Sequence, residues 1–120
     1  MATFTKNKLS GSTDGLAIKV TGTSTAATVT VHTAVAGTTA GVFDEIWLYA
    51  NNTSALAVKL TLEWGTDTAA DGNIELTIAA ESGLVLVVAG LILQNAKVVK
   101  AFAATADVLL LTGFVNSITA

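Results

Sequence analysis

Residues 45–65 read EIWLYANNTSALAVKLTLEWG, and the two halves of this stretch differ in pattern. In the second half, apolar residues fall at every other position, namely Leu56, Val58, Leu60, Leu62 and Trp64. This alternation is typical of a β-strand with one buried face. In the first half, the aromatic Trp47 and Tyr49 lie between Ile46 and Leu48, so both faces of that strand are apolar. The sequence therefore raises the question of what covers its second face.

Similar strand-like segments recur along the chain. They are rich in Val, Ile and Thr and are separated by clusters of Gly, Asn, Asp and Ser, which favour turns. No window combines helical periodicity with helix caps. About eight strands are predicted, over residues 16–21, 28–34, 43–50, 56–64, 73–79, 84–88, 97–103 and 108–116. This spacing predicts an all-β fold, an antiparallel β-sandwich that is jelly-roll-like, whose strand order does not follow from the pattern.

The length of 120 residues favours a single domain. Residues 1–15 are polar and rich in Gly and Ser, and we interpret them as an N-terminal arm that is ordered only against something else. Residues 16–120 are expected to form the sandwich. The chain has no proline, a residue that often protects exposed sheet edges, so we expect a neighbour or the arm to cover them.

The composition favours contact with other protein chains. Hydrophobic residues make up 52% of the chain and charged residues only 12%, where roughly 25% is usual. The net charge is -3 and all six basic residues are lysines, which disfavours binding to nucleic acid or to an anionic membrane. The N-terminus lacks the apolar core of a signal peptide, and the apolar run at 83–93 is shorter than a membrane span. We therefore expect synthesis in the cytoplasm.

The residues that could carry chemistry are few and scattered. With no cysteine, there is no thiol nucleophile or thiolate metal site. Alternation places the sole histidine, His32, on an outward face as a structural residue, with no local partners for a catalytic triad. Asp67 and Asp71 lack the spacing of a calcium loop. We therefore expect that the protein is not an enzyme, and we predict no catalytic, cofactor-binding or metal-binding residues.

Three predicted strands are apolar on both faces: 43–50, the segment 83–88 and 108–116. A sandwich strand normally buries only one face, and several large apolar side chains left in water would form an unusually large patch. We therefore predict that the second faces pack against another subunit. The predicted interface residues are Trp47, Tyr49, Leu109, Leu111 and Val115.

The chain also resembles a known class of proteins. The segments STDGLAIKVTGTS (12–24), TVHTAVAGTTAGVFDEIWLYANNTSALAVKLTLEWG (30–65), IAAESGLVLVVAGLIL (78–93) and VVKAFAATADVLLLTGFVN (98–116) resemble small virion proteins of tailed bacteriophages. The resemblance extends over residues 12–118. It lies in the general character of these sequence segments and includes no functional motif. It implies a capsid decoration (cement) protein on the surface of the phage head. It also implies a homo-oligomer, with a trimer favoured, that binds the major capsid protein.

Two other functions remain open from the residues alone. The first is a carbohydrate- or host-binding sandwich module of a phage tail or fibre, in which Trp47 and Tyr49 stack on sugar rings. The second is a small hydrolase built around His32 and nearby acids. Loss of glycan binding on changing Trp47 to Ala would indicate the first, and loss of activity on changing His32 to Ala the second.

Overall fold

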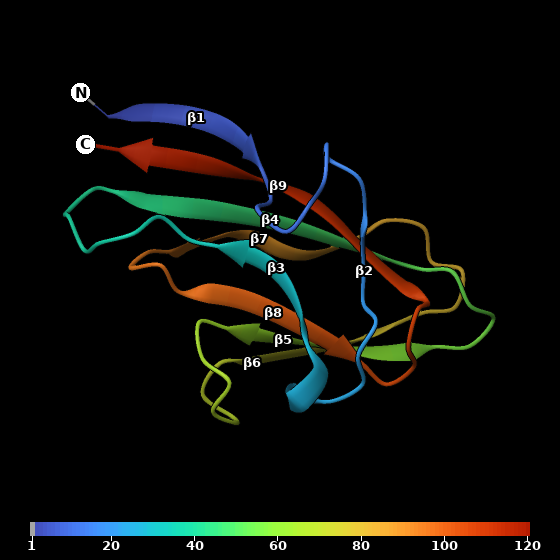
Figure 1. The fold of residues 1–120 in the computed structure, drawn as a ribbon. Helices are drawn as coiled ribbons and strands as arrows, with labels where there is room; N and C mark the ends of the chain where they lie inside the picture. Colours follow the sequence, from blue (N-terminus) through green and yellow to red (C-terminus); the bar gives the residue numbers. More distant parts are fainter. Residues whose placement is uncertain (1) are drawn as a thin grey trace.

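The fold is built entirely from β-strands, apart from one short 3₁₀ turn, in the computed structural model, which describes residues 2–120 (Figure 1). The elements are β1 (Thr3–Lys8), β2 (Ile18–Lys19), η1 (Thr25–Ala27), β3 (Val29–Thr33), β4 (Phe43–Asn52), β5 (Val58–Trp64), β6 (Asn73–Ile78), β7 (Val85–Leu93), β8 (Val98–Ala103) and β9 (Leu109–Thr119). The predicted all-β fold is confirmed, and the last seven predicted strands correspond to β3–β9.

The strands form two antiparallel sheets that face each other (Figure 1). The β4 sheet has the order β1-β9-β4-β7, with β2 also paired to β9, and the β5 sheet has the order β3-β8-β5-β6. The pairs β5·β6, β4·β7, β3·β8 and β1·β9 are nested in sequence, so the chain is one long antiparallel ribbon rolled up on itself. The added pairs β4·β9 and β5·β8 close the roll. This arrangement is a jelly roll.

Alternating side chains of both sheets fill the space between them. In β4, Ile46, Leu48 and Ala50 are all 0% exposed, while the residues between them are only half-buried. In β5, Val58, Leu60 and Leu62 face the same core. The expected inner faces of these two strands are therefore confirmed. Trp64 is half-buried and packs against this core.

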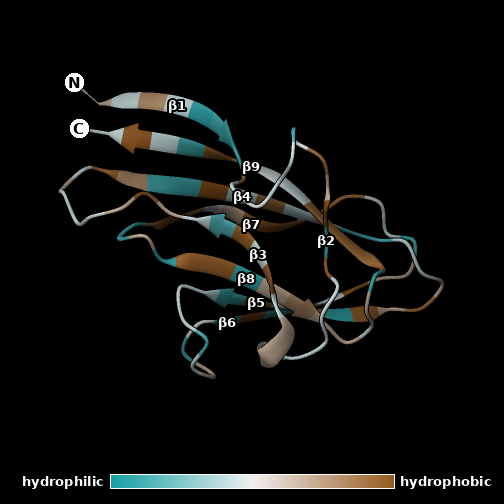
Figure 2. Ribbon diagram, in the orientation of Figure 1, coloured by the Kyte–Doolittle hydropathy of each residue, from teal (hydrophilic) through white to brown (hydrophobic). Residues whose placement is uncertain are grey.

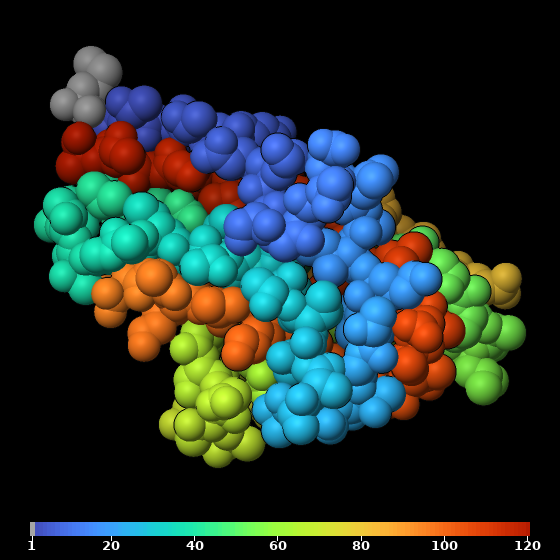
Figure 3. Space-filling model, viewed as in Figure 1, coloured from blue at the N-terminus to red at the C-terminus, as the bar shows by residue number. Residues whose placement is uncertain are grey.

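The segment expected to be a separate arm belongs to the sandwich. Residues Thr3–Lys8 form β1, which pairs with β9 from Thr3 opposite Thr119 to Lys8 opposite Phe114. Leu9, which follows, is 1% exposed and lies in the core. The chain then crosses the front of the molecule toward η1, as Figure 3 shows. The arm is thus ordered against its own chain, and a domain boundary at residue 15 is wrong.

The predicted strand at 16–21 is shortened to β2, Ile18–Lys19. Ile18 and Val20 are buried, but Leu16 is 66% exposed because it lies outside the paired segment. Similarly, Leu56 was expected to face inward at the start of the next alternating segment. It precedes β5 and is 76% exposed.

Candidate interaction surface

The outer face of the β4 sheet, which points away from the β5 sheet, carries most of the aromatic side chains. Trp47 on β4 lies directly opposite Phe114 on β9. Their rings are nearly parallel, with centroids 6.0 Å apart and an interplanar angle of 10°. Aromatic pairs of this kind contribute about 0.5–1.5 kcal/mol beyond the apolar area that they bury. The pair therefore fixes both rings on the surface of the sheet.

On the side of Phe114 away from Trp47, a side chain of β1 contacts the aromatic pair. The ammonium group of Lys6 lies over the Phe114 ring, with Nζ 4.3 Å from the ring centroid. This is a cation–π contact across neighbouring strands. It anchors β1, whose side chains are all exposed, to the sheet. The N-terminal strand is therefore held by main-chain pairing and by this contact.

On its other side, Trp47 extends over β7. The β4–β7 pairing shifts between Ile46 opposite Leu91 and Trp47 opposite Ala89, which leaves Gly90 as an extra, bulged residue. Gly90 has φ +76°, and a Cβ there would lie 3.1 Å from Cζ2 of Trp47. Glycine is required here for two reasons, the left-handed backbone and the indole that covers it. The bulge is thus fitted to the Trp47 ring.

Glu45 fixes the orientation of the indole. The Trp47 Nε1–H donates to Oε1 of Glu45 at 2.7 Å, and the Asn116 side-chain N–H donates to the same oxygen at 3.0 Å. These two hydrogen bonds, from Trp47 first and from Asn116 second, lower the pKa of Glu45 from its ordinary value, against a small opposing effect of burial. The carboxylate, the amide and the indole therefore form one connected group on the outer face.

Further apolar side chains flank this group on the same face. At the end of the sheet near the chain termini, Phe4 and Phe43 lie on either side of Ile118 in register. At the other end, Tyr49 lies opposite Thr112 on β9 and Leu86 on β7. The outer face of the β4 sheet is therefore a broad aromatic and aliphatic surface, with the charged Glu45 and Lys6 beside its central aromatic pair.

The structure separates the five predicted interface residues into two groups. Trp47 and Tyr49 lie on the outer face and are half-buried, so a role in an interface stays a prediction. Leu109, Leu111 and Val115 are each 0% exposed and belong to the core, so assigning them to an interface is wrong. On β9 it is Leu110 and Phe114 that point outward. Alternation identified the two faces of this strand but could not tell which was inside.

A second concentration of apolar residues lies along β7. Among residues 2–120, eight large hydrophobic side chains are exposed, and four of them are in or next to this strand. These are Leu84, Leu86, Leu91 and Ile92, which are 67%, 46%, 47% and 55% exposed. Most of β7 is coloured as hydrophobic in Figure 2. The sequence had already indicated this strand, since it is apolar on both faces.

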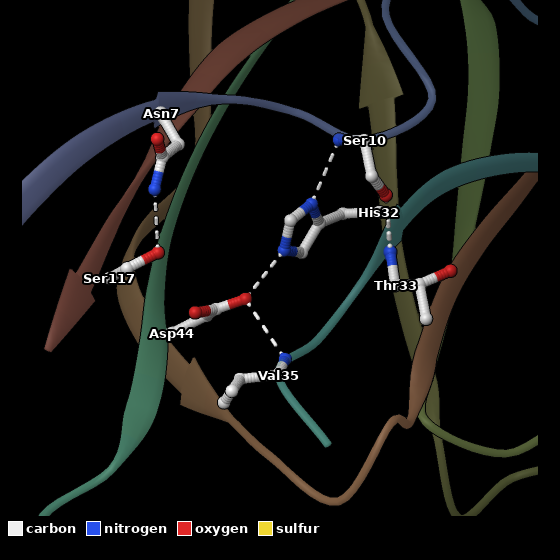
Figure 4. A network of polar contacts seen from close by, with 7 residues as sticks. All are labelled: Asn7, Ser10, His32, Thr33, Val35, Asp44 and Ser117. Carbon is white, nitrogen blue, oxygen red and sulfur yellow. Dashed lines mark hydrogen bonds and ion pairs between the residues drawn. The ribbon is translucent and has the colours of Figure 1, made fainter. Parts of the chain in front are cut away.

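His32 is buried, with 5% of its surface exposed, and so the prediction of an outward histidine is wrong. The cause is a β-bulge in the β3–β8 pairing between Thr30 and His32, which turns His32 inward next to Val31. Its Nε2 lies 2.8 Å from Oδ2 of Asp44, and its Nδ1 accepts a hydrogen bond of 3.0 Å from the Ser10 backbone N–H (Figure 4).

The hydrogen bonds around His32 determine its chemistry. Because Ser10 N–H donates to Nδ1, the neutral ring carries its proton on Nε2 and donates it to Asp44. Asp44 Oδ2 also accepts from the Val35 backbone N–H at 3.1 Å (Figure 4). Both ring nitrogens are thus engaged by the protein itself. The arrangement ties the segment after β1 to both sheets, and it offers no free nitrogen lone pair for a general base.

Glu63 is the other buried ionisable residue that stands out. It is 2% exposed, and Oε2 accepts a hydrogen bond of 2.6 Å from the Thr25 hydroxyl of η1. Its register partner on β6 is Asn73. Within the part of the chain that is described, Oε1 of Glu63 and Oδ1 of Asn73 are the two buried side-chain oxygens without a hydrogen-bond partner. Two acceptors therefore lie on neighbouring strands with no donor for either.

Over residues 2–120, no three His, Cys, Asp or Glu side chains lie together in a way that could hold a metal ion. The described part of the chain also has no helix long and apolar enough to span a membrane. Comparison with protein-family models, curated proteins and solved structures gives no match for this chain. Its function must therefore be argued from its own surface.

Proposed function

We propose that this protein is a capsid decoration protein of a tailed bacteriophage, which binds the assembled head as a homo-oligomer and stabilises it. The observation that carries the proposal is the outer face of the β4 sheet. On this face an ordered aromatic group, Trp47 with Phe114, lies among further apolar side chains. Aromatic side chains are enriched at the centres of protein interfaces.

The fold supports the same proposal by analogy. Jelly rolls occur in viral capsid domains, although they also occur in lectins and cupins, so the fold alone does not select a function. The low charge content, 12% of residues, is unusual for a freely diffusing monomer and suits a protein that lies against other chains. The internal use of both nitrogens of His32 favours a structural role for the one histidine.

The mechanism is thermodynamic linkage. A protein that binds only the assembled shell stabilises it by RT ln(1 + [L]/Kd), which is about 2.7 kcal/mol per site when the free protein is at 100 times its Kd. No covalent step is needed. The chain has only to present a rigid surface, and the hydrogen bonds of Glu45 to Trp47 and Asn116 hold that surface in one arrangement.

The test is binding of the purified protein to phage heads that lack it. Saturable binding, and heads that withstand higher temperature when coated, are expected for the unmodified chain. Trp47→Ala should weaken binding, whereas Leu16→Ala should not, since Leu16 is exposed in the unpaired segment before β2. The proposal would be contradicted if the heads did not bind the unmodified protein and their stability were unchanged in its presence.

The alternative function is binding of carbohydrate by a tail or fibre module. It is favoured by the parallel rings of Trp47 and Phe114 on an accessible sheet face, because aromatic faces stack on sugars. It predicts glycan binding that is lost in Trp47→Ala while the oligomeric state is preserved. If the protein bound no glycan of a panel but did bind phage heads, this alternative would be excluded in favour of the decoration role.

A further inference from the structure

The β4 sheet ends at β7, whose outer edge has no partner. β7 pairs with β4 on one side only. No other backbone hydrogen bond from residues 2–120 reaches Val85–Leu93. The strand is nine residues long and contains no charge and no proline. A long apolar edge of this kind presents main-chain donors and acceptors that readily pair with another strand.

The other edges of the two sheets are protected. The edge at β3 is covered by the segment after β1, where the Gly11 N–H donates to the Val31 carbonyl at 2.9 Å. The free edge at β1 carries Lys6 and Lys8. The edge at β6 is shorter and carries Glu75. Charges and covering segments are the usual means by which proteins block unwanted strand pairing. β7 is the edge that has neither.

We propose that β7 pairs antiparallel with β7 of a second copy of this chain, around a two-fold axis close to Ala89. The order β1-β9-β4-β7 would then continue through β7 of the partner into the partner's own sheet. The inference rests on the proposed function only in that the protein acts as a homo-oligomer, and it assigns the surface that makes the oligomer.

The sequence of β7 fits pairing with itself. It reads VLVVAGLIL, with large apolar residues at both ends and Ala89 and Gly90 near the middle. About an axis at Ala89, Leu86 lies opposite Ile92 of the other copy. Both residues are on the outer face, since Leu86 is in register with Tyr49 and Ile92 with Glu45. Because the strand carries no charge, pairing with a copy of itself brings no like charges together.

The same register places a projecting side chain opposite a hollow. A hollow of about 540 Å³ lies between the end of β7, the turn that follows it and the connection before β4, and its lining includes Phe43, Ile92, Leu93 and Gln94 together with Asn95 and Lys97. Leu84, 67% exposed, lies just before β7 and falls opposite Gln94 of the second copy. One chain thus provides both the projecting leucine and a hollow with a partly apolar lining, which is what a two-fold contact requires. This complementarity favours a second copy over an unrelated partner.

The two bulges of β7 limit how far pairing can spread. Val87 and Gly90 are the extra residues at the two register shifts. Bulges bend a strand and interrupt the ladder, so the contact is short and depends on the side chains at its ends. A two-fold contact uses the β7 edge of both copies and is therefore closed. The expected product is a dimer, in place of the trimer that the phage resemblance implies.

The test is the solution mass by light scattering, measured for the unmodified chain and for two variants of it. The unmodified protein should be a dimer. Ile92→Lys should weaken dimerisation by about tenfold or more, because a lysine at an apolar contact loses hydration without a partner. Leu16→Lys, at a site that is 66% exposed and far from β7 in sequence, should leave the dimer intact. Circular dichroism establishes that each variant is folded.

A cross-link tests the register. The chain has no cysteine, so Ala89→Cys introduces a single thiol beside the expected axis. Mild oxidation should join two copies of Ala89→Cys, and should not join copies of Ala55→Cys, an exposed control position. The β7 contact would be overturned if Ala89→Cys did not cross-link or if the unmodified protein were a monomer or a trimer. It would also be overturned if the dimer survived Ile92→Lys.

These outcomes are separable from failure of the proposed function. A protein that is abundant in phage heads but forms a trimer in solution would refute the β7 contact alone. A dimer that depends on Ile92 but is absent from heads would refute the decoration role alone.

Discussion

His32 and Asp44 join the two sheets through one buried contact, with 2.8 Å between Nε2 and Oδ2. His32 belongs to β3 and Asp44 to β4, and each residue is 5% exposed. Because Ser10 donates to the other ring nitrogen, the same imidazole also holds the segment that follows β1. A single side chain therefore connects three parts of the fold.

The first prediction concerns this contact. His32→Ala should lower the free energy of unfolding by roughly 3 kcal/mol, because the Asp44 carboxylate would remain buried without its main partner. Lys59→Gln is the matched control. It breaks the Lys59–Glu75 ion pair, whose side chains are about half exposed, and should cost less than about 1 kcal/mol. Urea unfolding followed by tryptophan fluorescence measures both. Equal losses would mean that burial of the His32 contact adds nothing.

The second prediction concerns the bulge beneath Trp47. Gly90→Ala and Gly37→Ala both place a Cβ on a left-handed backbone, with φ of +76° and +88°. Gly37→Ala, where the new Cβ meets nothing within 4 Å, should cost about 1–2 kcal/mol. Gly90→Ala should cost more, since its Cβ would press on the indole. The excess should disappear when Trp47 is also replaced by Ala, and an excess that persists would contradict the assigned contact.

The third prediction concerns Glu45 and pH. Hydrogen bonds from Trp47 and Asn116 lower its pKa in the folded protein, so its contribution to stability is present above the unfolded pKa, near 4.5. That contribution is lost as the pH falls through the lower, folded value. Trp47→Phe removes the first donor and should move the pKa of Glu45 back toward 4.5. Carboxyl NMR titration measures the shift, and an unchanged pKa would show that the indole hydrogen bond is not formed.

The fourth prediction concerns Glu63. Glu63→Gln should raise the free energy of unfolding by about 1 kcal/mol, because it removes a buried charge and supplies an amide donor opposite Asn73. Glu75→Gln, on the exposed part of the same strand pair, is the control and should change stability by less than about 1 kcal/mol. A clear loss of stability in Glu63→Gln would indicate that the carboxylate binds a donor such as a cation.

The fold was largely predictable because a strand that buries one face in the core has apolar residues at every other position. β4 and β5 follow it closely, as Ile46, Leu48, Leu60 and Leu62 show. β1 was missed because TFTKNK has no buried side chain, so its pairing with β9 leaves no hydrophobic signal. The nested strand order depends on long-range pairing, which a local pattern does not encode.

The site was predicted only in part. Trp47 and Tyr49 were placed on the correct face, since Ile46 and Leu48 are the better core residues beside them. In β9 both faces are equally apolar, and the choice of Leu109, Leu111 and Val115 as the outward set was wrong. His32 was misplaced because a bulge changes the side-chain direction without any mark in the sequence. The alternation of apolar residues therefore does not reveal the inner face of a strand that is apolar on both sides, or the side-chain direction after a bulge.

The decoration role is tested most directly by counting copies of this chain in purified phage particles by quantitative mass spectrometry. A copy number comparable with that of the major capsid protein is the predicted result, since the outer face of the β4 sheet would then be used at sites all over the shell. A handful of copies per particle, as for a tail component, or none at all, would contradict it.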